Sequence, residues 1–599
     1  MQIEKNLALM WKDRVQRFGE KTYMRYKRDG QWIPLTYNQV NNIVDEIALG
    51  LLTLGVKRGD RISLLSENRP EWAFADLAAQ CLGAILVTIY ATNTPAQCEY
   101  IINNSESDFV MLSNNNQLTK LTSKNLDITR VKSIVIFDPI EGITDKDPRV
   151  KTLEEIKEMG RRYEKKEALQ GMIEASTHDD VATLIYTSGT TGNPKGVMLT
   201  HGNFLSNCAS VLSVVPITPH EDFLSFLPLS HSLERTAGHF GPLYLGATVT
   251  YAESVDALSN NLQEIKPTIM ISVPRIYEKV HGRIMDNVKG YPPLKQKLFH
   301  WAVGVAKQHL KYELDKKSPP LALKLQYDLA DKLVFSKIKA NLGGKMRFAI
   351  SGGAPLAPEL FEFFFSIGVH IYEGYGLTET TPIITANTPD AVRMGSVGKV
   401  IPGVTVKIAD DGEILVKGPN VMKGYWKREE DTAEALEGGW FHTGDIGVID
   451  GEGFLKITDR KKDLIVTAGG KNVAPQNIEN LMKLQPYIEQ VNVIGDKRKF
   501  LTAIIVPTFP ALEKWAKEKG IGYNDHADLV KKPEVKELIA KDVEKVNAEL
   551  AKFESIKKFH LSAVEFTQEN DMMTPTMKVR RKLVNKYFAT VRQSSSLNS

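Results

Sequence analysis

The stretch Y-T-S-G-T-T-G-N-P-K-G-V, residues 186–197, decides the expected fold. It follows a short apolar run, residues 181–185, that is typical of a buried strand. A loop rich in glycine and hydroxyl side chains after a strand exposes backbone N–H groups, and Lys195 adds a positive charge. These features favour a phosphate-binding loop. It is not a Walker A loop, because Lys195 lies between Pro194 and Gly196. A flexible surface loop is the simpler alternative.

Strands and helices alternate on both sides of this loop. Thr36 and Gln39 form a capping-box pattern that begins a helix, and residues 70–82 and 95–103 have the pattern of two more. The expected strands are residues 61–66, 84–89, 108–112 and 133–137 before the loop and 223–227, 248–251 and 269–273 after it. This alternation predicts an α/β protein with mostly parallel, buried strands.

Two more glycine turns follow expected strands. S-G-G-A-P-L, residues 351–356, comes after the strand 347–350, and E-G-Y-G-L-T-E, residues 373–379, comes after the strand 369–372. Ligands of open α/β sheets bind at the carboxyl ends of strands. We therefore expect these two turns and the opening loop to form one nucleotide site.

The composition changes after Gly395 to short β segments separated by Gly and Asp, which predict hairpins or a small barrel. Residues 459–475 then join a polar turn to a glycine-rich loop, so we place a domain boundary at Asp459. The prediction is a large domain, residues 1–458, of parallel α/β sheets plus a small β-barrel, and a smaller, mobile α+β domain, residues 459–599.

The overall composition limits the classes of protein to consider. A chain of 599 residues is too long for one core, and its net charge of +4 does not indicate a nucleic-acid partner. Its three cysteines form no metal or disulfide pattern, and neither a signal peptide nor a membrane span is predicted. A cytoplasmic location is expected. Residues 284–340 are helical in pattern and rich in lysine, which predicts a solvated face or a patch that touches anionic lipid.

Six motifs in this order give a specific resemblance. They are Y-T-S-G-T-T-G-N-P-K-G, S-G-G-A, Y-G-L-T-E, H-T-G-D, D-R-K-K-D and P-T-M-K. The chain resembles the adenylate-forming superfamily, and P-L-S-H-S-L-E-R (228–235) and G-G-K-N-V-A-P (469–475) are similar to its long-chain fatty acyl-CoA synthetases. The resemblance implies that a fatty acid reacts with ATP to give acyl-AMP and pyrophosphate. Coenzyme A then displaces AMP. The implied co-substrates and cofactor are ATP, coenzyme A and Mg²⁺.

The resemblance also implies roles for residues of the large domain. Thr187 and Glu379 would contact Mg²⁺, Thr378 would donate to the α-phosphate, and His231 would gate the thiol tunnel. The loop residues Thr187, Ser188, Gly189, Thr190, Thr191, Gly192 and Lys195 would hold the β- and γ-phosphates. The adenine would be bound by Gly352, Gly353, Glu373, Gly374 and Tyr375.

Residues on both sides of the predicted boundary would complete the site. Asp445, near the end of the large domain, would bridge the ribose hydroxyls, and Arg460 and Lys462 of the smaller domain would lie near the ribose and phosphate. Lys578 would stabilise the charge that develops during adenylation. Asp459 would be the hinge about which the domain rotates. That rotation would withdraw Lys578 and bring Gly469, Gly470 and Lys471 to the pantetheine route.

Two alternatives to an acyl-CoA synthetase stay open at this point. One is a fatty acyl-AMP ligase that delivers its product to a carrier protein. The other is an inactive protein that binds lipid or nucleotide on the same scaffold. A homodimer and a peripheral contact with membrane lipid are also considered as partners.

Overall fold

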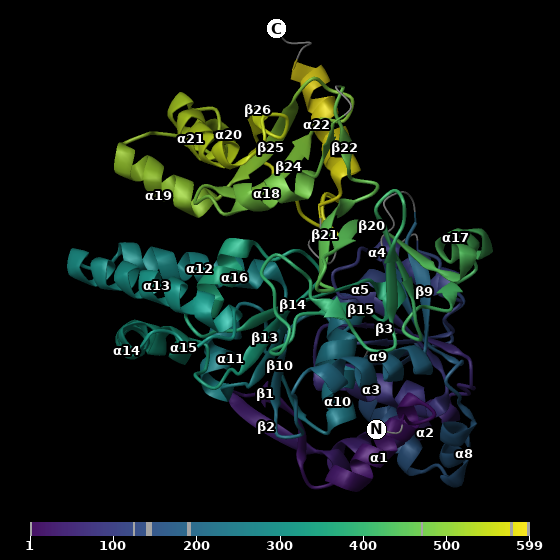
Figure 1. Ribbon diagram of the computed structural model, residues 1–599. Coiled ribbons are helices and arrows are strands. Elements are labelled where there is room, and N and C mark those ends of the chain that lie inside the picture. The colour runs from purple at the N-terminus through teal and green to yellow at the C-terminus, as the bar shows by residue number, and fades with distance from the viewer. Residues whose placement is uncertain are drawn as a thin grey trace. The chain divides into compact units, whose positions relative to one another are not determined.

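The computed structural model describes residues 3–123, 126–138, 147–187, 193–468, 471–574 and 579–595. The chain divides into two compact units, whose elements are labelled in Figure 1. The first comprises Met1–Lys407, Leu415–His442 and Asp450–Leu455. The second comprises Ile408–Ile414, Thr443–Ile449 and Lys456–Ser599. The second unit therefore includes two short segments that precede the long C-terminal one.

An eight-stranded sheet of the first unit contains the opening loop. Its order is β19-β9-β8-β4-β3-β5-β6-β7. The strands are β3 (Arg61–Ser66), β4 (Ile85–Tyr90), β5 (Phe109–Leu112), β6 (Ser133–Ile136), β7 (Val150–Thr152), β8 (Val181–Thr187), β9 (Lys195–Thr200) and β19 (Gly424–Tyr425). Pairing is parallel from β8 to β7, whereas β9 and β19 add antiparallel strands at one edge.

A nine-stranded sheet of the same unit contains the other two glycine motifs. Its order is β16-β15-β14-β13-β12-β10-β11-β1-β2. The strands are β1 (Thr22–Arg28), β2 (Gln31–Thr36), β10 (Asp222–Ser225), β11 (Thr248–Tyr251), β12 (Ile269–Ser272), β13 (Phe348–Ser351), β14 (Ile371–Gly376), β15 (Ile383–Ala386) and β16 (Lys399–Val400). The expected parallel strands are thus divided between two sheets.

Helix α3 (Pro70–Leu82) packs against strands of both sheets, since it contacts β1 of the nine-stranded sheet and β3 and β4 of the eight-stranded one. All its residues except Glu71 are buried. The sequence explains this position, because P-E-W-A-F-A-D-L-A-A-Q-C-L is apolar or small on nearly every side, and such a helix must be covered all round. Gly83 ends it in the left-handed conformation, with φ +62°.

The remaining helices of the first unit cover the sheets or extend from them. Thr36 caps α2 (Tyr37–Thr53) with the reciprocal capping box that the sequence predicts. The others are α1 (Leu7–Phe18), α4 (Pro95–Ser105), α5 (Asn115–Leu121), α7 (Leu153–Arg161), α8 (Glu167–Ala175), α9 (His201–Val214), η1 (Glu234–Phe240), α10 (Gly241–Leu245), α11 (Leu258–Ile265), α12 (Pro274–Lys289), α13 (Pro293–Leu314), α14 (Leu321–Ala330), η2 (Asp331–Phe335), α15 (Ser336–Asn341), α16 (Pro358–Ser366), η3 (Thr378–Thr380), α17 (Glu429–Ala435) and η4 (Glu437–Gly439). Both η1 and η2 are π-helical turns.

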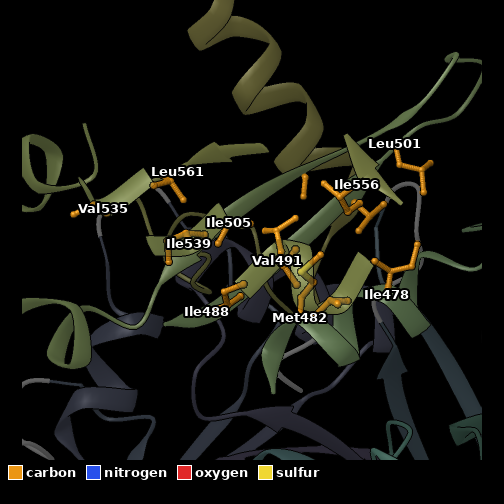
Figure 2. Packing of buried hydrophobic residues seen from close by; sticks show 14 of the residues in the cluster. Ile478, Met482, Ile488, Val491, Leu501, Ile505, Val535, Ile539, Ile556 and Leu561 are labelled. Atoms are coloured by element: carbon orange, nitrogen blue, oxygen red, sulfur yellow. The ribbon is translucent and has the colours of Figure 1, made fainter. Parts of the chain in front are cut away.

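The second unit has a core of its own. Three strands in the order β24-β25-β26 pack against its helices, and Figure 2 shows the aliphatic side chains between them. The elements are β22 (Ile465–Val466), β23 (Asn472–Val473), α18 (Pro475–Lys483), β24 (Ile488–Ile494), β25 (Leu501–Pro507), α19 (Phe509–Lys519), α20 (His526–Leu529), α21 (Pro533–Glu549), β26 (Ile556–Leu561) and α22 (Arg581–Ser595). Met482, Val491 and Leu501 are fully buried there.

The segments expected to form hairpins or a small barrel make a four-stranded sheet. Its order is β17-β18-β20-β21, with β17 (Thr405–Ile408), β18 (Glu413–Lys417), β20 (Phe441–Ile449) and β21 (Leu455–Arg460). In the described ranges, no helix combines the length and the apolar character that crossing a bilayer would require.

The expected turn at residues 373–376 is wrong. Strand β14 continues to Gly376, because Gly374 and Tyr375 pair with Ala386 and Thr385 of β15. A Cβ on Gly376 would lie 1.6 Å from the Pro382 carbonyl oxygen, so the close approach of that backbone requires glycine there. The turn begins only after Gly376.

Candidate functional site

The opening loop joins β8 to β9, which form a β-hairpin beside the edge strand β19 of the eight-stranded sheet. Thr187 ends β8, Lys195 begins β9, and the two residues pair directly across the hairpin. The predicted residues Ser188, Gly189, Thr190, Thr191 and Gly192 lie outside the described residues. Thr187 and Lys195 are thus held at the base of the loop by a regular ladder of hydrogen bonds.

Lys195 is ion-paired in this structure. Its Nζ lies 2.5 Å from Oδ1 of Asp431, which belongs to α17, and 5.0 Å from the ring centroid of Tyr425. The Asp431 carboxylate also pairs with Arg428, and these two cations hold the pKa of Asp431 below its ordinary value. Lys195 therefore already contacts an anionic group of the chain itself.

Glu379, the predicted metal ligand, shares Tyr425 with Lys195. The Tyr425 hydroxyl donates to Oε1 of Glu379 over 2.9 Å. The backbone supports this contact, because Met422 N–H donates to the Glu379 carbonyl and β19 pairs Tyr425 with Val197. Strand β9 also contacts η3. The structure therefore brings Lys195 to the ring and Glu379 to the hydroxyl of one tyrosine, although Lys195 begins β9 of the eight-stranded sheet and Glu379 follows β14 of the nine-stranded one.

Thr378, the predicted α-phosphate donor, is buried beside a residue that the sequence did not indicate. Its Oγ1 lies 3.2 Å from Oγ of Ser232, which is fully buried. The next residue, Leu233, contacts the position of Gly352, where an added Cβ would lie 3.1 Å from its side chain. The segment 228–233 thus connects the predicted phosphate and adenine residues.

The predicted adenine residues lie on neighbouring strands. Gly352 and Gly353 follow β13, and Glu373, Gly374 and Tyr375 lie within β14, which pairs with β13. Glu373 is buried and accepts a hydrogen bond from Leu356 N–H over 2.9 Å. Burial raises the pKa of Glu373 to about 7, despite that hydrogen bond. At neutral pH this carboxyl can therefore be protonated or ionised.

His231 lies in the connection between β10 and η1. Its Nδ1 accepts a hydrogen bond from Leu233 N–H over 3.2 Å, and its backbone N–H donates to Pro228. The ring is half-buried. These contacts orient His231 within the same segment that reaches Thr378 through Ser232.

A buried ionic network lies behind this segment. Arg235 of η1 donates to both carboxylate oxygens of Asp76 on α3 and to Thr183 on β8. Both charged side chains are fully buried, and His239 lies 3.4 Å from Asp76. Burial would raise the pKa of Asp76, but Arg235 and His239 lower it to about 2. One guanidinium therefore ties the helix between the sheets to the strand that leads into Thr187.

The predicted residues of the second unit include one ion pair. Asp445 is buried in β20, and its Oδ1 lies 3.2 Å from Nε of Arg460 in β21. Lys462 is exposed after β21. Lys471, also exposed, directly precedes β23, and its backbone carbonyl accepts a hydrogen bond from Thr467 N–H. Gly469, Gly470 and Lys578 lie outside the described residues.

Asp459, the predicted hinge, is buried in β21. Its Oδ1 accepts from the Arg460 N–H, and its Oδ2 has no hydrogen-bond partner among the described residues. Burial raises the pKa of Asp459 to about 6, with Arg581 opposing that rise. A buried carboxylate with one unpaired oxygen is an unfavourable arrangement for a plain strand residue.

Sequence patterns did not indicate Ser232, Tyr425 and Asp431. Tyr425 lies in a two-residue strand, and its partner Glu379 is 46 positions away in the chain. No local periodicity or motif of residue types connects such positions. Only the pairing of β19 with β9 places Tyr425 beside Glu379 and Lys195.

Together, the fold and the described contacts define a class: a two-unit α/β protein in which Lys195, at the base of a glycine-rich sequence, and Glu379 both contact Tyr425. Two family models cover most of the chain. The AMP-binding enzyme model matches residues 11–426, and the model of the AMP-binding enzyme C-terminal domain matches residues 462–593. The chain belongs to the AMP-binding enzyme family. This confirms the predicted family and fold class.

Relatives and solved structures agree with this assignment. The chain is 37% identical over 576 residues to the long-chain-fatty-acid–CoA ligase FadD15 of Mycobacterium bovis, covering 95% of this chain and 93% of that protein. It is 33% identical to fatty acyl-CoA synthetase A of Dictyostelium discoideum, covering 94% of this chain and 85% of that protein. The adenylation domain of a Mycobacterium chelonae carboxylate reductase has the same fold, with a TM-score of 0.77, 23% identity and coverage of 99% and 91%.

Proposed function

We propose that this protein joins a long-chain fatty acid to coenzyme A at the expense of ATP, through an acyl-adenylate, and releases AMP and pyrophosphate. The observation that carries the proposal is the 37% identity to a long-chain-fatty-acid–CoA ligase across 93% of that protein. The site supports it, because Thr187 pairs with Lys195 across the β8–β9 hairpin, and Lys195 and Glu379 both contact Tyr425.

ATP binding is assigned to the first unit. Lys195 and the loop from Thr187 to Gly192 hold the β- and γ-phosphates, and Thr378 donates to the α-phosphate. The adenine lies against Gly352, Gly353, Glu373, Gly374 and Tyr375. Glu373 suits an adenine amino group, since its buried carboxyl keeps one oxygen for hydrogen bonding beyond the bond to Leu356.

The donor set at Glu379 and Thr187 fits magnesium. Mg²⁺ prefers oxygen ligands and is usually held by one or two carboxylates together with substrate phosphates. Among the described residues, no group of three or more His, Cys, Asp or Glu side chains could hold a metal ion by itself. Glu379 and Thr187 would therefore share the ion with ATP, and the ion supplies neutralisation of phosphate charge. Tyr425 orients the carboxylate for that purpose.

The second unit supplies the ribose contacts and the residues that change between the two half-reactions. Asp445 binds the ribose hydroxyls, supported by Arg460, and Lys462 lies near the phosphate. Lys578 stabilises the charge that develops when the carboxylate attacks the α-phosphate. We assign the hinge to Asp459 and the pantetheine contacts to Gly469, Gly470 and Lys471. His231 gates the thiol route from its position next to Ser232, which contacts Thr378.

The cytoplasm is the proposed location, and the buried free thiols of Cys81, Cys98 and Cys208 support it because they suit a reducing compartment. Peripheral contact with membrane lipid and a homodimer are proposed as further associations. Size-exclusion chromatography with light scattering would test the dimer.

The function is tested by measuring pyrophosphate release over a series of fatty acids, with and without coenzyme A. We expect acid-dependent release with long-chain acids and AMP release that requires coenzyme A. AMP release only with a carrier protein that bears a free phosphopantetheine thiol would support the carrier-protein ligase instead. No acid-dependent pyrophosphate would support the inactive binding protein. Lys578→Ala is expected to lose adenylation, yet still transfer the acyl group from added acyl-AMP to coenzyme A.

Asp431 is expected to compete with the triphosphate for Lys195. Asp431→Asn removes the partly exposed ion pairs with Lys195 and Arg428. The Lys195 pair contributes about 1 kcal/mol or less, so the inhibition constant of pyrophosphate should fall up to roughly fivefold. Product inhibition at constant ATP measures this. Glu430→Gln on the same helix, which makes no contact with Lys195 in the described structure, is the control. Weaker pyrophosphate binding in Asp431→Asn would show that Asp431 positions Lys195 rather than competing for it.

A further inference from the structure

Four leucines form an exposed row on α14 and η2, which we call the leucine face. Leu321, Leu325, Leu329 and Leu333 are 73%, 61%, 49% and 43% exposed. The same segment buries Ala330 and Phe335 completely. A surface helix ordinarily points its polar side to water. This segment instead packs one apolar side into the protein and leaves a second apolar side, the leucine face, exposed to solvent.

The spacing of the leucine face keeps it on one side of the segment. A repeat of four residues drifts slowly around an α-helix of 3.6 residues per turn. The wider π-helical turn of η2 (Asp331–Phe335) counteracts that drift at the end of the row. The result is a continuous stripe about three turns long.

The neighbouring helix adds apolar surface. Helix α13 packs along α14 and also contacts η2, and the group is shown in teal in Figure 1. Its first half presents Leu294, Leu298 and Trp301, which are all exposed and spaced for one helix side. Phe299 and Val305 of the same helix are instead buried in the protein.

The charge of this region differs from that of the whole chain. Residues 284–340 contain eleven lysines and five acidic residues, a net charge of +6. The whole chain carries +4, so the rest of it has a net charge of −2. Lys297, Lys324 and Lys332 are exposed near the apolar residues, and none has an ion-pair partner among the described residues. The basic charge is therefore concentrated around the exposed leucines.

The chemistry of this surface favours lipid over protein. Protein interfaces are enriched in arginine and aromatic residues and depleted in lysine. Residues 284–340 contain no arginine and a single tryptophan. Leucines on one helix side with lysines beside them are instead typical of helices that lie in the headgroup region of an anionic bilayer.

We propose that α13, α14 and η2 form a docking surface for an anionic phospholipid bilayer. The leucine face enters the boundary between headgroups and acyl chains, and the lysines contact the lipid phosphates. The surface deepens the peripheral lipid contact proposed above, and it does not depend on the catalytic proposal, because it requires neither ATP nor coenzyme A. If the protein also activates long-chain fatty acids, docking places it where such acids are dissolved.

Co-sedimentation with vesicles tests the proposal without substrates. The full chain is expected to bind vesicles of equal parts phosphatidylcholine and phosphatidylglycerol more tightly than vesicles of phosphatidylcholine alone. The triple variant Leu321→Ser/Leu325→Ser/Leu329→Ser should lower the partition coefficient at least about tenfold, since three partly exposed leucines lose their burial in lipid. These side chains are exposed, so the variant should fold normally, which circular dichroism would check.

Two matched controls separate the surface from general effects. Val255→Ser replaces an apolar residue of similar exposure elsewhere and should leave binding unchanged. Lys324→Glu/Lys332→Glu should abolish the preference for phosphatidylglycerol, whereas Lys517→Glu/Lys536→Glu, with the same change of net charge on the second unit, should retain most of it. The proposal is overturned if the wild type binds neither kind of vesicle, or if the leucine variant binds as well as the wild type.

A kinetic measurement separates this surface from the catalytic proposal. With a long-chain acid supplied in anionic vesicles, the leucine variant should be slower than the wild type by the factor lost in binding. With a water-soluble medium-chain acid, the two should be equal. Inactive wild type that still binds vesicles would refute the proposed function alone, and equal rates with vesicle-borne acid would refute the docking surface alone.

Discussion

Replacing Glu379 with glutamine is expected to lower acid-dependent pyrophosphate release by roughly 10²–10³-fold. Glutamine has the shape of glutamate and can still accept from the Tyr425 hydroxyl. It lacks the negative charge that a hard cation requires. The loss should therefore appear in the magnesium dependence of adenylation, with the half-saturating Mg²⁺ concentration raised well above that of the wild type.

Tyr425→Phe is the matched variant for this experiment. It keeps the Glu379 carboxylate and the aromatic ring beneath Lys195, but it removes the 2.9 Å hydrogen bond that orients the carboxylate. A lost hydrogen bond to a charged group is worth about 1.5–3 kcal/mol, so a reduction of roughly ten- to a hundredfold is expected. Glu379→Gln with wild-type magnesium dependence would exclude Glu379 as a metal ligand.

Asp76→Ala is expected to destabilise the first unit by about 3–5 kcal/mol. The substitution leaves the Arg235 guanidinium fully buried with Thr183 as its remaining hydrogen-bond partner. Aromatic rings at 5.5 Å, Trp72 among them, surround the cation but cannot accept its N–H groups. The midpoint of thermal unfolding at neutral pH measures the loss.

Two variants test whether the unpaired charge of buried Arg235 causes the loss of stability. Asp45→Ala removes a partly exposed pair with Lys12 and should cost about 1 kcal/mol or less. Asp76→Leu/Arg235→Met removes both buried charges and should be more stable than Asp76→Ala, because no uncompensated ion remains. If the double variant were less stable than the single one, the network would contribute through packing instead.

The pH dependence has a definite sign. The pKa of Asp76 is about 2 in the folded protein and 3.8 ordinarily. Since the folded value is the lower one, the stabilisation is present above about pH 4 and is lost as the pH falls towards 2. The difference in stability between wild type and Asp76→Ala should therefore shrink in acid, whereas above pH 5 it should be constant as far as Asp76 is concerned.

The sequence alone predicted the family, the α/β class and most element positions. Helix α3 spans the predicted residues 70–82, and strand β3 spans the predicted residues 61–66. These elements were predictable because apolar runs, caps and glycine turns depend on neighbours within a few positions of the chain. The site residues were predicted from short motifs, because each motif is a run of neighbouring residues that can be read from the sequence.

Only the tertiary structure decided how these pieces meet. Strand β8 belongs to one sheet and β13 and β14 belong to another, and the sequence pattern did not divide the strands between the two sheets. The continuation of β14 to Gly376 depends on pairing with β15, and the place of Tyr425 between Lys195 and Glu379 depends on pairing of β19 with β9. Each is a contact between distant parts of the chain. Neither hydrophobic periodicity nor turn chemistry contains such pairings, because they are selected by the packing of the whole unit.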